Sequence, residues 1–321
     1  MPARQSYPRF SDANLRGVFF GAFDDTMAAS YLNELAMRVD SNKAFEQYGW
    51  LGTAPAMREW KGGRQLQQPN AFEWALYNKK FESSIRLSID DIERDQTSQF
   101  DIYAASLGQR AAENPILLLS DLLIASETSV CFDGQYFFDT DHVEGNSGIN
   151  NNDISIPLSG LPVILHGGGP TTPSDEEMEK AILRAVRQMY TFKDDQGQPV
   201  NQTARQFALV APISLMDVVL AATQNKVMTS GRQNTLTTAT SFKITPYFDP
   251  RLTWTTKFAL FRTDHAVKPF IHQVEYENRL SSITDPNSDH VFKHDEYLFG
   301  AKRSEAVGYG DYKKAVLATL T

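Results

Sequence analysis

Alternating apolar and polar residues predict a β-strand over residues 80–90. The odd positions carry the apolar side chains, at Phe81, Ile85, Leu87 and Ile89. Successive side chains of an extended chain point to opposite faces, so this pattern buries one face and leaves the other in water. In residues 72–77 the apolar side chains fall on even positions instead. This change of phase predicts a bulge or bend near Tyr77 and Asn78.

The residues before this strand carry three tryptophans and a polar turn. The turn is Lys61-Gly62-Gly63-Arg64, which suits a hairpin tip, and the tryptophans are Trp50, Trp60 and Trp74. We therefore expect a long two-stranded ribbon. An isolated hairpin is marginally stable in water, because it buries little of its own apolar surface. The tryptophans need a covering surface, supplied by the rest of this chain or by another chain.

Helical spacing predicts a long helix over residues 95–126, with Pro115 bending it or splitting it in two. A second helix is predicted from Ser174, which forms a capping-box pattern with Glu177, through Tyr190. Two shorter helices are expected: one capped by Asp24 or Asp25 and running through Ala36, and one capped by Ser214 with Asp217. A buried strand is predicted over residues 207–211, and extended segments dominate after residue 242. The second half is therefore α/β or α+β.

The N-terminal segment contains an apolar cluster with little core of its own around it. Its aromatic members are Phe19, Phe20 and Phe23. We interpret it as an arm that docks elsewhere. Aromatic residues are enriched at protein interfaces, so we expect the arm and the ribbon to supply contacts between subunits. The predicted interface residues are Phe19, Phe20, Phe23, Trp50, Trp60, Arg64 and Trp74.

The chain has 321 residues and a net charge of −8. An acidic chain is a poor general binder of nucleic acid, although it can line a container for DNA. Cys131 is the single cysteine, so no intrachain disulfide forms, and we interpret it as a buried structural thiol. The N-terminal residues have no apolar core typical of a secretory signal, and no apolar run is long enough to span a bilayer. We expect a cytosolic protein, or one assembled there, with no membrane partner.

One cluster of residues offers an enzymatic alternative. Asp139, Asp141 and His142, with His290, predict a metal-dependent hydrolase if the fold brings them together. The HExxH pattern is absent, and Asp-His pairs in loops more often make hydrogen bonds. Residues 167–169 are three glycines without the Lys-Ser/Thr of a phosphate-binding loop, so a linker is favoured. No catalytic residue and no cofactor are expected.

Six motifs, in order along the chain, resemble the major head subunit of Mu-like tailed phages and prophages. They are YGWLG at residues 48–52, Glu59-Trp60 with Gly62 and Arg64, FDGQYFFDTDH at 132–142, KPFIHQ at 268–273, DHVFKHDEYLFGA at 289–301 and GYGDY at 308–312. The resemblance covers residue 41 to the end, and is weaker over residues 146–258.

The resemblance implies the α+β tailed-phage major capsid fold. Residues 1–44 would form an N-terminal arm, and residues 45–92 an extended β-hairpin loop lying on a neighbouring subunit. Residues 93–153 would form a peripheral domain with a long spine helix. Residues 154–262 would form an axial domain, and residues 263–321 would return as strands to the peripheral domain.

The implied function is a self-assembling shell protein without catalysis. Pentamers and hexamers would close an icosahedral head around double-stranded DNA, without reading its sequence. Separate scaffold or protease and portal proteins are implied as partners, and the protein would belong to the virion, assembled in the host cytoplasm. A nanocompartment shell of the same fold, enclosing an enzyme, stays open as an alternative.

Overall fold

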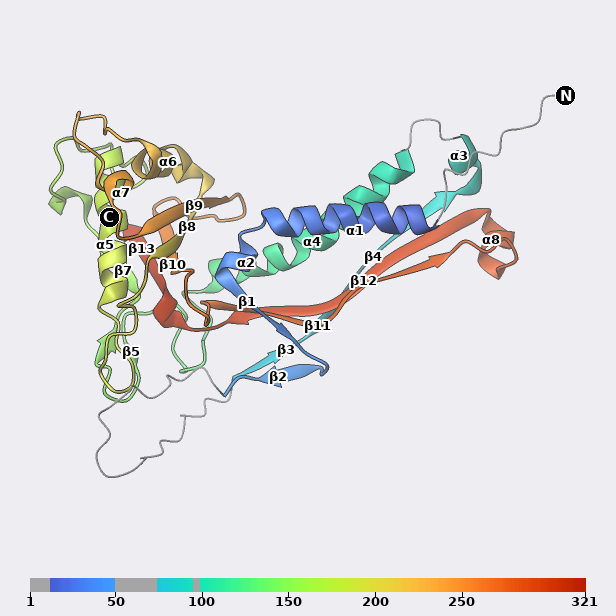
Figure 1. The fold of residues 1–321 in the computed structure, drawn as a ribbon, viewed down its shortest axis with the longest axis horizontal. Coiled ribbons are helices and arrows are strands. Elements are labelled where there is room, and N and C mark those ends of the chain that lie inside the picture. The colour runs from blue at the N-terminus through green and yellow to red at the C-terminus, as the bar shows by residue number, and fades with distance from the viewer. Residues whose placement is uncertain (1–11, 50–73, 95–98) are drawn as a thin grey trace.

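The structure is a computed structural model that describes residues 12–49, 74–94 and 99–321. It has an elongated part built of long strands and two long helices, and a compact part that contains the C-terminus (Figure 1). Each part is organised around its own sheet. The chain is therefore a mixed α+β protein, as predicted.

A four-stranded sheet runs the length of the elongated part, in the order β1-β11-β12-β4. Its strands are β1 (Ala36–Asp40), β4 (Lys79–Ser88), β11 (Phe270–Ile283) and β12 (Glu296–Tyr309). The strand predicted over residues 80–90 is confirmed as β4, except that Ile89 begins helix α3 (Ile89–Arg94). Its place was not foreseen: β4 pairs with β12, with Ile85 opposite Phe299, and so belongs to the body rather than to the ribbon.

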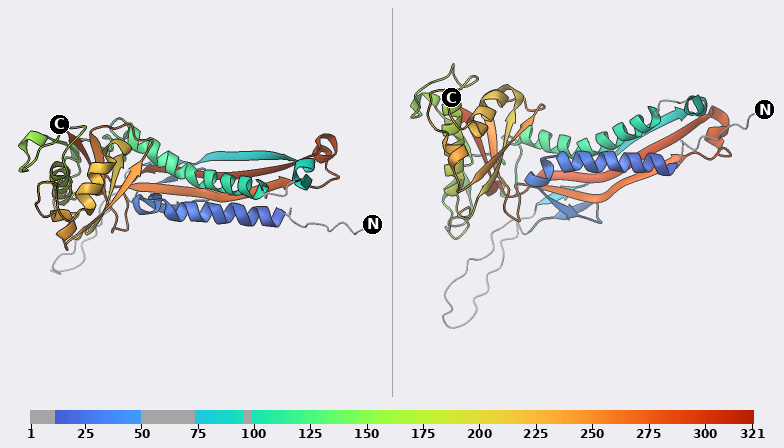
Figure 2. Two further views of the ribbon diagram at one scale, coloured as in Figure 1. Left: turned by 90° about the horizontal axis from the view of Figure 1, so that it is seen from above. Right: turned by 45° about the horizontal axis from the view of Figure 1, so that its top comes forward.

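Two helices, α1 (Asp12–Ala29) and α4 (Gln99–Ala125), lie side by side along this sheet (Figure 2). The predicted long helix is confirmed as α4, which continues through Pro115 without splitting. The predicted cap at Asp24 or Asp25 is wrong, because both residues lie inside α1. The predicted continuation through Ala36 is also wrong. Helix α2 (Leu32–Leu35) ends there and Ala36 begins β1.

The ribbon is described only at its base. Strand β2 (Phe45–Gln47) pairs with β3 (Ala75–Tyr77) in an antiparallel two-stranded sheet. The extended segment is interrupted at Asn78, between β3 and β4, where the Asn78 amide donates to the Ala44 carbonyl at 2.8 Å. This interruption confirms the bend predicted from the change of phase.

The compact part is built on a five-stranded sheet in the order β7-β13-β10-β8-β9. Its strands are β7 (Asp153–Ile156), β8 (Gln206–Pro212), β9 (Lys243–Asp249), β10 (Lys257–Arg262) and β13 (Ala315–Leu320). Residues 263–321 were expected to return as strands to the peripheral domain. Strands β11 and β12 lie in the four-stranded sheet, whereas β13 lies in this second sheet. The strand predicted over residues 207–211 is confirmed as β8.

Both faces of the five-stranded sheet are covered. Leu209, with its alternate neighbours, packs against α5 (Asp175–Tyr190) and α6 (Met216–Gln224). Val210 and its alternate neighbour Ala208 point to the other face of the sheet, into a second core that extends to the elongated part. In this core Phe137 stacks on Tyr309 with ring centroids 4.6 Å apart. Strands buried on both faces read as continuous apolar runs, as β8 does.

The caps of the shorter elements show where local patterns succeed and fail. The capping box of Ser174 and Glu177 is present with both of its hydrogen bonds. The predicted cap at Ser214 is wrong, because its hydroxyl donates to the Trp254 carbonyl and α6 has no side-chain cap. Residues 289–294, expected as part of an extended segment, form the short helix α8 (Asp289–His294) at the far end of the elongated part (Figure 1).

The remaining elements are short. They are β5 (His142–Val143), β6 (Ile149–Asn150), α7 (Thr235–Thr238), and the 3-10 helices η1 (Leu158–Gly160), η2 (Ile213–Leu215) and η3 (Tyr312–Lys314). Within the described ranges, no helix combines the length and the apolar character that crossing a membrane requires.

Candidate assembly surfaces

The base of the ribbon is fastened to the body through a buried glutamine. Gln273 on β11 is fully buried, and its side-chain oxygen accepts a hydrogen bond of 2.6 Å from the Tyr48 hydroxyl. Its amide nitrogen donates to the Leu76 carbonyl at 3.2 Å, and the Tyr48 amide donates to the Trp74 carbonyl at 2.7 Å. One side chain of the main sheet therefore holds both strands of the ribbon where they leave the body.

A glycine permits this close approach. A Cβ atom on Gly308 of β12 would lie 2.8 Å from Leu76 Cδ1, which is closer than ordinary carbon contacts allow.

Burial raises the pKa of the Tyr48 hydroxyl well above its usual range, with the Glu46 carboxylate adding to the shift. The hydroxyl therefore remains a hydrogen-bond donor.

An exposed aromatic pair lies on the ribbon beside this attachment. Phe45 and Tyr77 face each other across β2 and β3 and stack with centroids 5.1 Å apart. They remain 41% and 61% exposed. Sequence reasoning missed this pair. The available signal was that both aromatic residues flank the tryptophan-bearing segment.

Of the ribbon residues predicted to contact a neighbouring subunit, only Trp74 lies within the described residues. Trp50, Trp60 and Arg64 lie outside the described residues. Trp74 is partly buried and packs against the core shared with the elongated part. Its indole Nε1 is buried and has no hydrogen-bond partner among the residues that the structure describes. Trp74 therefore packs in part against its own chain, and its predicted role in subunit contacts stays a prediction.

The predicted N-terminal arm docks on its own chain. Phe19 is buried beside Leu107 of α4 and Ala301 of β12, and Phe23 packs partly against the same cluster. Phe20, which meets Phe19 edge-to-face, is 38% exposed. The expectation that this segment docks elsewhere is therefore wrong for Phe19. The missed signal was helical spacing: Leu15, Phe19 and Phe23 recur every four residues.

The helix contact itself is very close. A Cβ atom added to Gly108 of α4 would lie 2.2 Å from the Phe19 carbonyl oxygen of α1. Only glycine allows the two backbones to approach this closely. The docking of α1 is therefore built into the sequence of α4.

The residues of the predicted metal site are not brought together. His142 lies near β5 at the compact end, whereas His290 lies on α8 at the opposite end of the molecule (Figure 1). Asp139 accepts hydrogen bonds from the amides of Tyr136 and Thr140. The predicted hydrolase set is therefore wrong.

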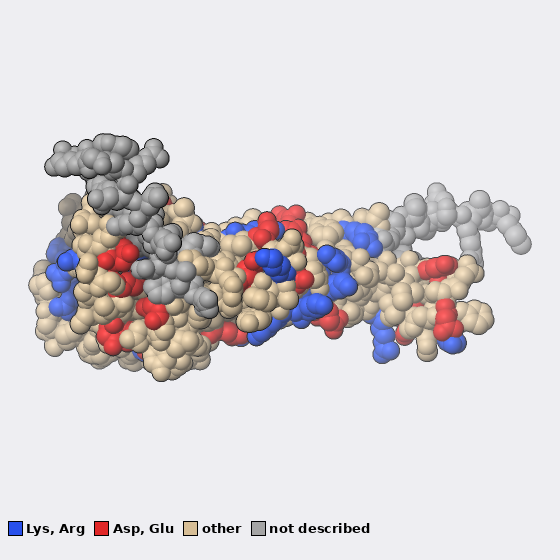
Figure 3. Space-filling view, turned by 90° about the horizontal axis from the view of Figure 1, so that it is seen from below, with Lys and Arg blue, Asp and Glu red and all other residues tan. Residues whose placement is uncertain are grey.

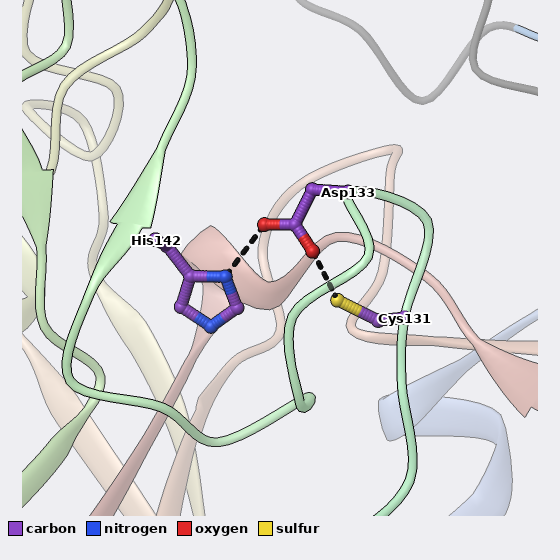
Figure 4. A group of neighbouring side chains, drawn as sticks. All are labelled: Cys131, Asp133 and His142. Carbon is purple, nitrogen blue, oxygen red and sulfur yellow. Dashed lines mark hydrogen bonds and ion pairs between the residues drawn. The ribbon is translucent and has the colours of Figure 1, made fainter.

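His142 instead joins Asp133 and Cys131 in a buried cluster (Figure 4). His142 Nδ1 lies 2.6 Å from one oxygen of Asp133, and Cys131 Sγ lies 3.0 Å from the other. Burial raises the pKa of the Cys131 thiol far above its usual range, and the Asp133 carboxylate adds to this. The thiol therefore stays protonated and donates to Asp133. These are hydrogen-bond separations, which indicates a structural role, as predicted for Cys131.

Charged side chains are mixed on the face drawn in Figure 3. Lysine and arginine alternate with aspartate and glutamate along the elongated part on this face. Among the exposed charges, Arg38 on β1 pairs with Glu277 on the neighbouring strand β11 at 2.5 Å. Mixed charge of this kind favours solubility over strong binding to one partner.

Comparison with known proteins agrees with this architecture. The chain matches the family model of the Mu-like prophage major head subunit gpT over residues 13–156 and 252–319. The chain belongs to this family. The matched ranges include the four-stranded sheet, the strands β7, β10 and β13 of the five-stranded sheet, the helices α1 and α4 and the ribbon base. The range outside the match contains α5, β8, α6 and β9.

The major capsid protein of Escherichia phage Mu is 29% identical over 301 residues, which are 94% of this chain and 70% of that protein. A chain in the procapsid of bacteriophage JBD30 aligns with a TM-score of 0.54 at 23% identity, covering 97% of this chain and 76% of that one. A chain of a virus-like particle from Pyrococcus furiosus aligns with a TM-score of 0.52 at 11% identity, covering 94% and 97%. These likenesses show the tailed-phage capsid fold, which confirms the resemblance read from the motifs.

Proposed function

We propose that this chain is the major capsid protein of a Mu-like phage or prophage and closes, in many copies, into an icosahedral head around double-stranded DNA. The match to the head-subunit family, which spans the four-stranded sheet and three strands of the five-stranded sheet, carries this proposal. The subunit would do no catalysis. Both carboxylate oxygens of Asp133 are already bonded, to Cys131 and to His142 Nδ1, which supports that reading.

Pentamers and hexamers would form the shell. The compact part would be the axial domain, and the elongated part with α4 as spine helix would be the peripheral domain. The ribbon would lie on a neighbouring subunit and contribute Trp50, Trp60 and Arg64. The attachment through Gln273 supports this arrangement, because a firmly held base directs a projecting ribbon toward one partner surface.

The assembly would need further proteins. A separate scaffold or protease would guide closure, and a portal protein would admit DNA. The finished protein would be part of the virion after assembly in the host cytoplasm. The DNA would be enclosed without recognition of its sequence, in keeping with the net charge of −8.

Expression of the full chain with and without Trp60→Ala tests the proposal. We expect the wild-type chain to sediment as closed particles of uniform size in electron micrographs. The variant should form far fewer particles, while its unfolding midpoint in urea stays close to that of the wild type. A wild-type chain that remains monomeric at all concentrations, also with its scaffold present, would contradict the proposal.

A shell of the same fold that encloses protein cargo is the second candidate, because the fold of a shell subunit does not specify what the shell contains. The contents of purified particles discriminate the two. DNA that resists nuclease until the particles are opened indicates a phage head. A stoichiometric enzyme with no protected DNA indicates a nanocompartment.

A further inference from the structure

Helix α5 carries a basic hollow, formed by Lys180, Arg184 and Arg187. The spacing of four and three residues places the three side chains on one face of the helix. Together with Leu183 and residues 160–162 they line an open hollow. The opposite face of α5, with Met178 and Ile182, is buried against the five-stranded sheet. The basic hollow therefore lies on the face of α5 that points away from the five-stranded sheet.

The positive charge of the basic hollow is not neutralised within the described part of the chain. Arg184 and Arg187 form no ion pair or hydrogen bond with any residue that the structure describes. Lys180 lies 3.5 Å from Glu179, whose carboxylate is already bound by Arg232 and by the Thr235 amide. Two of these cations thus have no counter-charge, and the third shares one.

The acidic residues at the start of α5 do not compensate. Glu176 accepts hydrogen bonds from the amides of Ile164 and Leu165, at 2.7 and 3.1 Å, and pairs with Arg232. Asp175 accepts from the amide and hydroxyl of Thr229. These carboxylates fasten two loops to the helix. The basic hollow, one to three turns further along, remains open to an anion from outside the chain.

We propose that the basic hollow binds consecutive phosphates on the backbone of the packaged double-stranded DNA. This inference rests on the proposed function, because only a head encloses DNA. Residues 180–187 span about 10 Å of helix, and a DNA strand places one phosphate per about 3.4 Å of its axis, so three cations match roughly three phosphates. Arginine forks bind phosphate oxygens in pairs. The contact is confined to phosphates, so it carries no sequence preference.

A local contact of this kind suits a chain with a net charge of −8. The chain as a whole is acidic, so the duplex would touch the shell at repeated small basic sites instead of adhering to it everywhere. Three phosphate contacts per subunit bind weakly at physiological salt, and many copies add together.

The test uses the full chain, kept below the concentration at which it assembles, and a short DNA duplex of mixed sequence. Binding should weaken about 40-fold between about 50 and about 200 mM salt, with a log–log slope of about −2.7. The triple variant Lys180→Gln, Arg184→Gln, Arg187→Gln should lose most of this slope and at least about tenfold in affinity at the lower salt. The matched control Lys79→Gln, Lys80→Gln, Lys302→Gln removes three cations from the four-stranded sheet and should bind like the wild type.

Two further measurements complete the test. The first distinguishes duplex DNA from free phosphate as the bound anion, and the second distinguishes failure of this inference from failure of the proposed function. Inorganic phosphate should compete only weakly with the duplex; tight binding of inorganic phosphate without duplex binding would overturn the DNA assignment. Electron microscopy should show that the triple variant still closes into shells. If it fails to close while the wild type closes, the basic hollow is a contact between copies and the inference is wrong. If the wild type itself never closes, the proposed function fails, whatever the duplex result.

Discussion

The hydroxyl of Tyr48 lies 2.6 Å from the side-chain oxygen of Gln273, and this contact joins the ribbon to the main sheet. Both side chains are buried. Tyr48→Phe leaves the Gln273 oxygen without its donor, which costs about 1–3 kcal/mol in a buried site. We expect a lower unfolding midpoint in urea and a larger loss of particle yield, because the ribbon base is loosened.

Tyr103→Phe is the control for this change, since Tyr103 on α4 is 55% exposed. It should alter neither stability nor particle yield. Equal particle yields from Tyr48→Phe and the wild type would show that the attachment at Gln273 is irrelevant to assembly.

The close contact of α1 and α4 at Gly108 gives a second prediction. Gly108→Ala places a methyl group against the Phe19 carbonyl, so the helices must move apart. We expect a loss of about 1–3 kcal/mol in unfolding free energy and faster proteolysis within α1. Gly21→Ala in α1 meets no atom within 4 Å and should stabilise the helix by about 0.5–1 kcal/mol. Stability of Gly108→Ala at or above that of wild type would refute the docking.

Glu176, in the first turn of α5, predicts that the stability of the folded chain depends on pH. Burial alone would raise the pKa of Glu176, but hydrogen bonds from Ser230, from the amides of Leu165 and Ile164 and from Arg232 lower it to about 2. Because the pKa of Glu176 is lower in the folded state than its ordinary value of 4.5, this residue stabilises the folded state at pH values above 4.5. The contribution is therefore fully present near neutral pH. It is lost as the pH falls toward about 2.

Chemical unfolding at several pH values measures this effect. The difference in stability between wild type and Glu176→Gln should be largest at pH values above 4.5 and should shrink as the pH approaches about 2. Asp289→Asn, which alters an exposed carboxylate on α8, serves as the control and should show no such trend. A difference that does not change with pH would contradict the lowered pKa.

The buried cluster of Cys131, Asp133 and His142 gives a prediction about metal. Its side chains are spaced for hydrogen bonds, with 2.6 Å between His142 and Asp133. Treatment with a strong chelator should therefore leave the melting temperature unchanged, and Asp133→Asn should lower it with or without chelator. A melting temperature that falls after chelation and recovers on adding zinc would establish a metal site instead.

The sequence pattern was most informative where structure is local. The alternation at Phe81, Ile85 and Leu87 and the capping box at Ser174 depend on residues a few positions apart, and both are present. The placement of elements depended on partners far along the chain. Strand β4 pairs with β12 and strand β13 with β10, and the period-2 pattern of a strand carries no information about which edge it joins.

The assembly residues were only partly accessible to the same reasoning. The resemblance to head subunits pointed to the ribbon, but Phe19 was misplaced because its helical spacing with Leu15 and Phe23 was overlooked. The role of Gln273 required the structure, since a lone glutamine within KPFIHQ has no distinctive pattern. Its importance comes from two hydrogen bonds to segments about two hundred residues away in the chain.

A cryo-electron microscopy reconstruction of particles formed by the purified full chain, with its scaffold where required, tests the central claim most directly. The account predicts a closed shell in which residues 50–73 of each copy contact a neighbouring copy, while Tyr48 and Gln273 stay bonded within one chain. Particles in which residues 50–73 contact only their own subunit, or a chain that forms no shell, would contradict it.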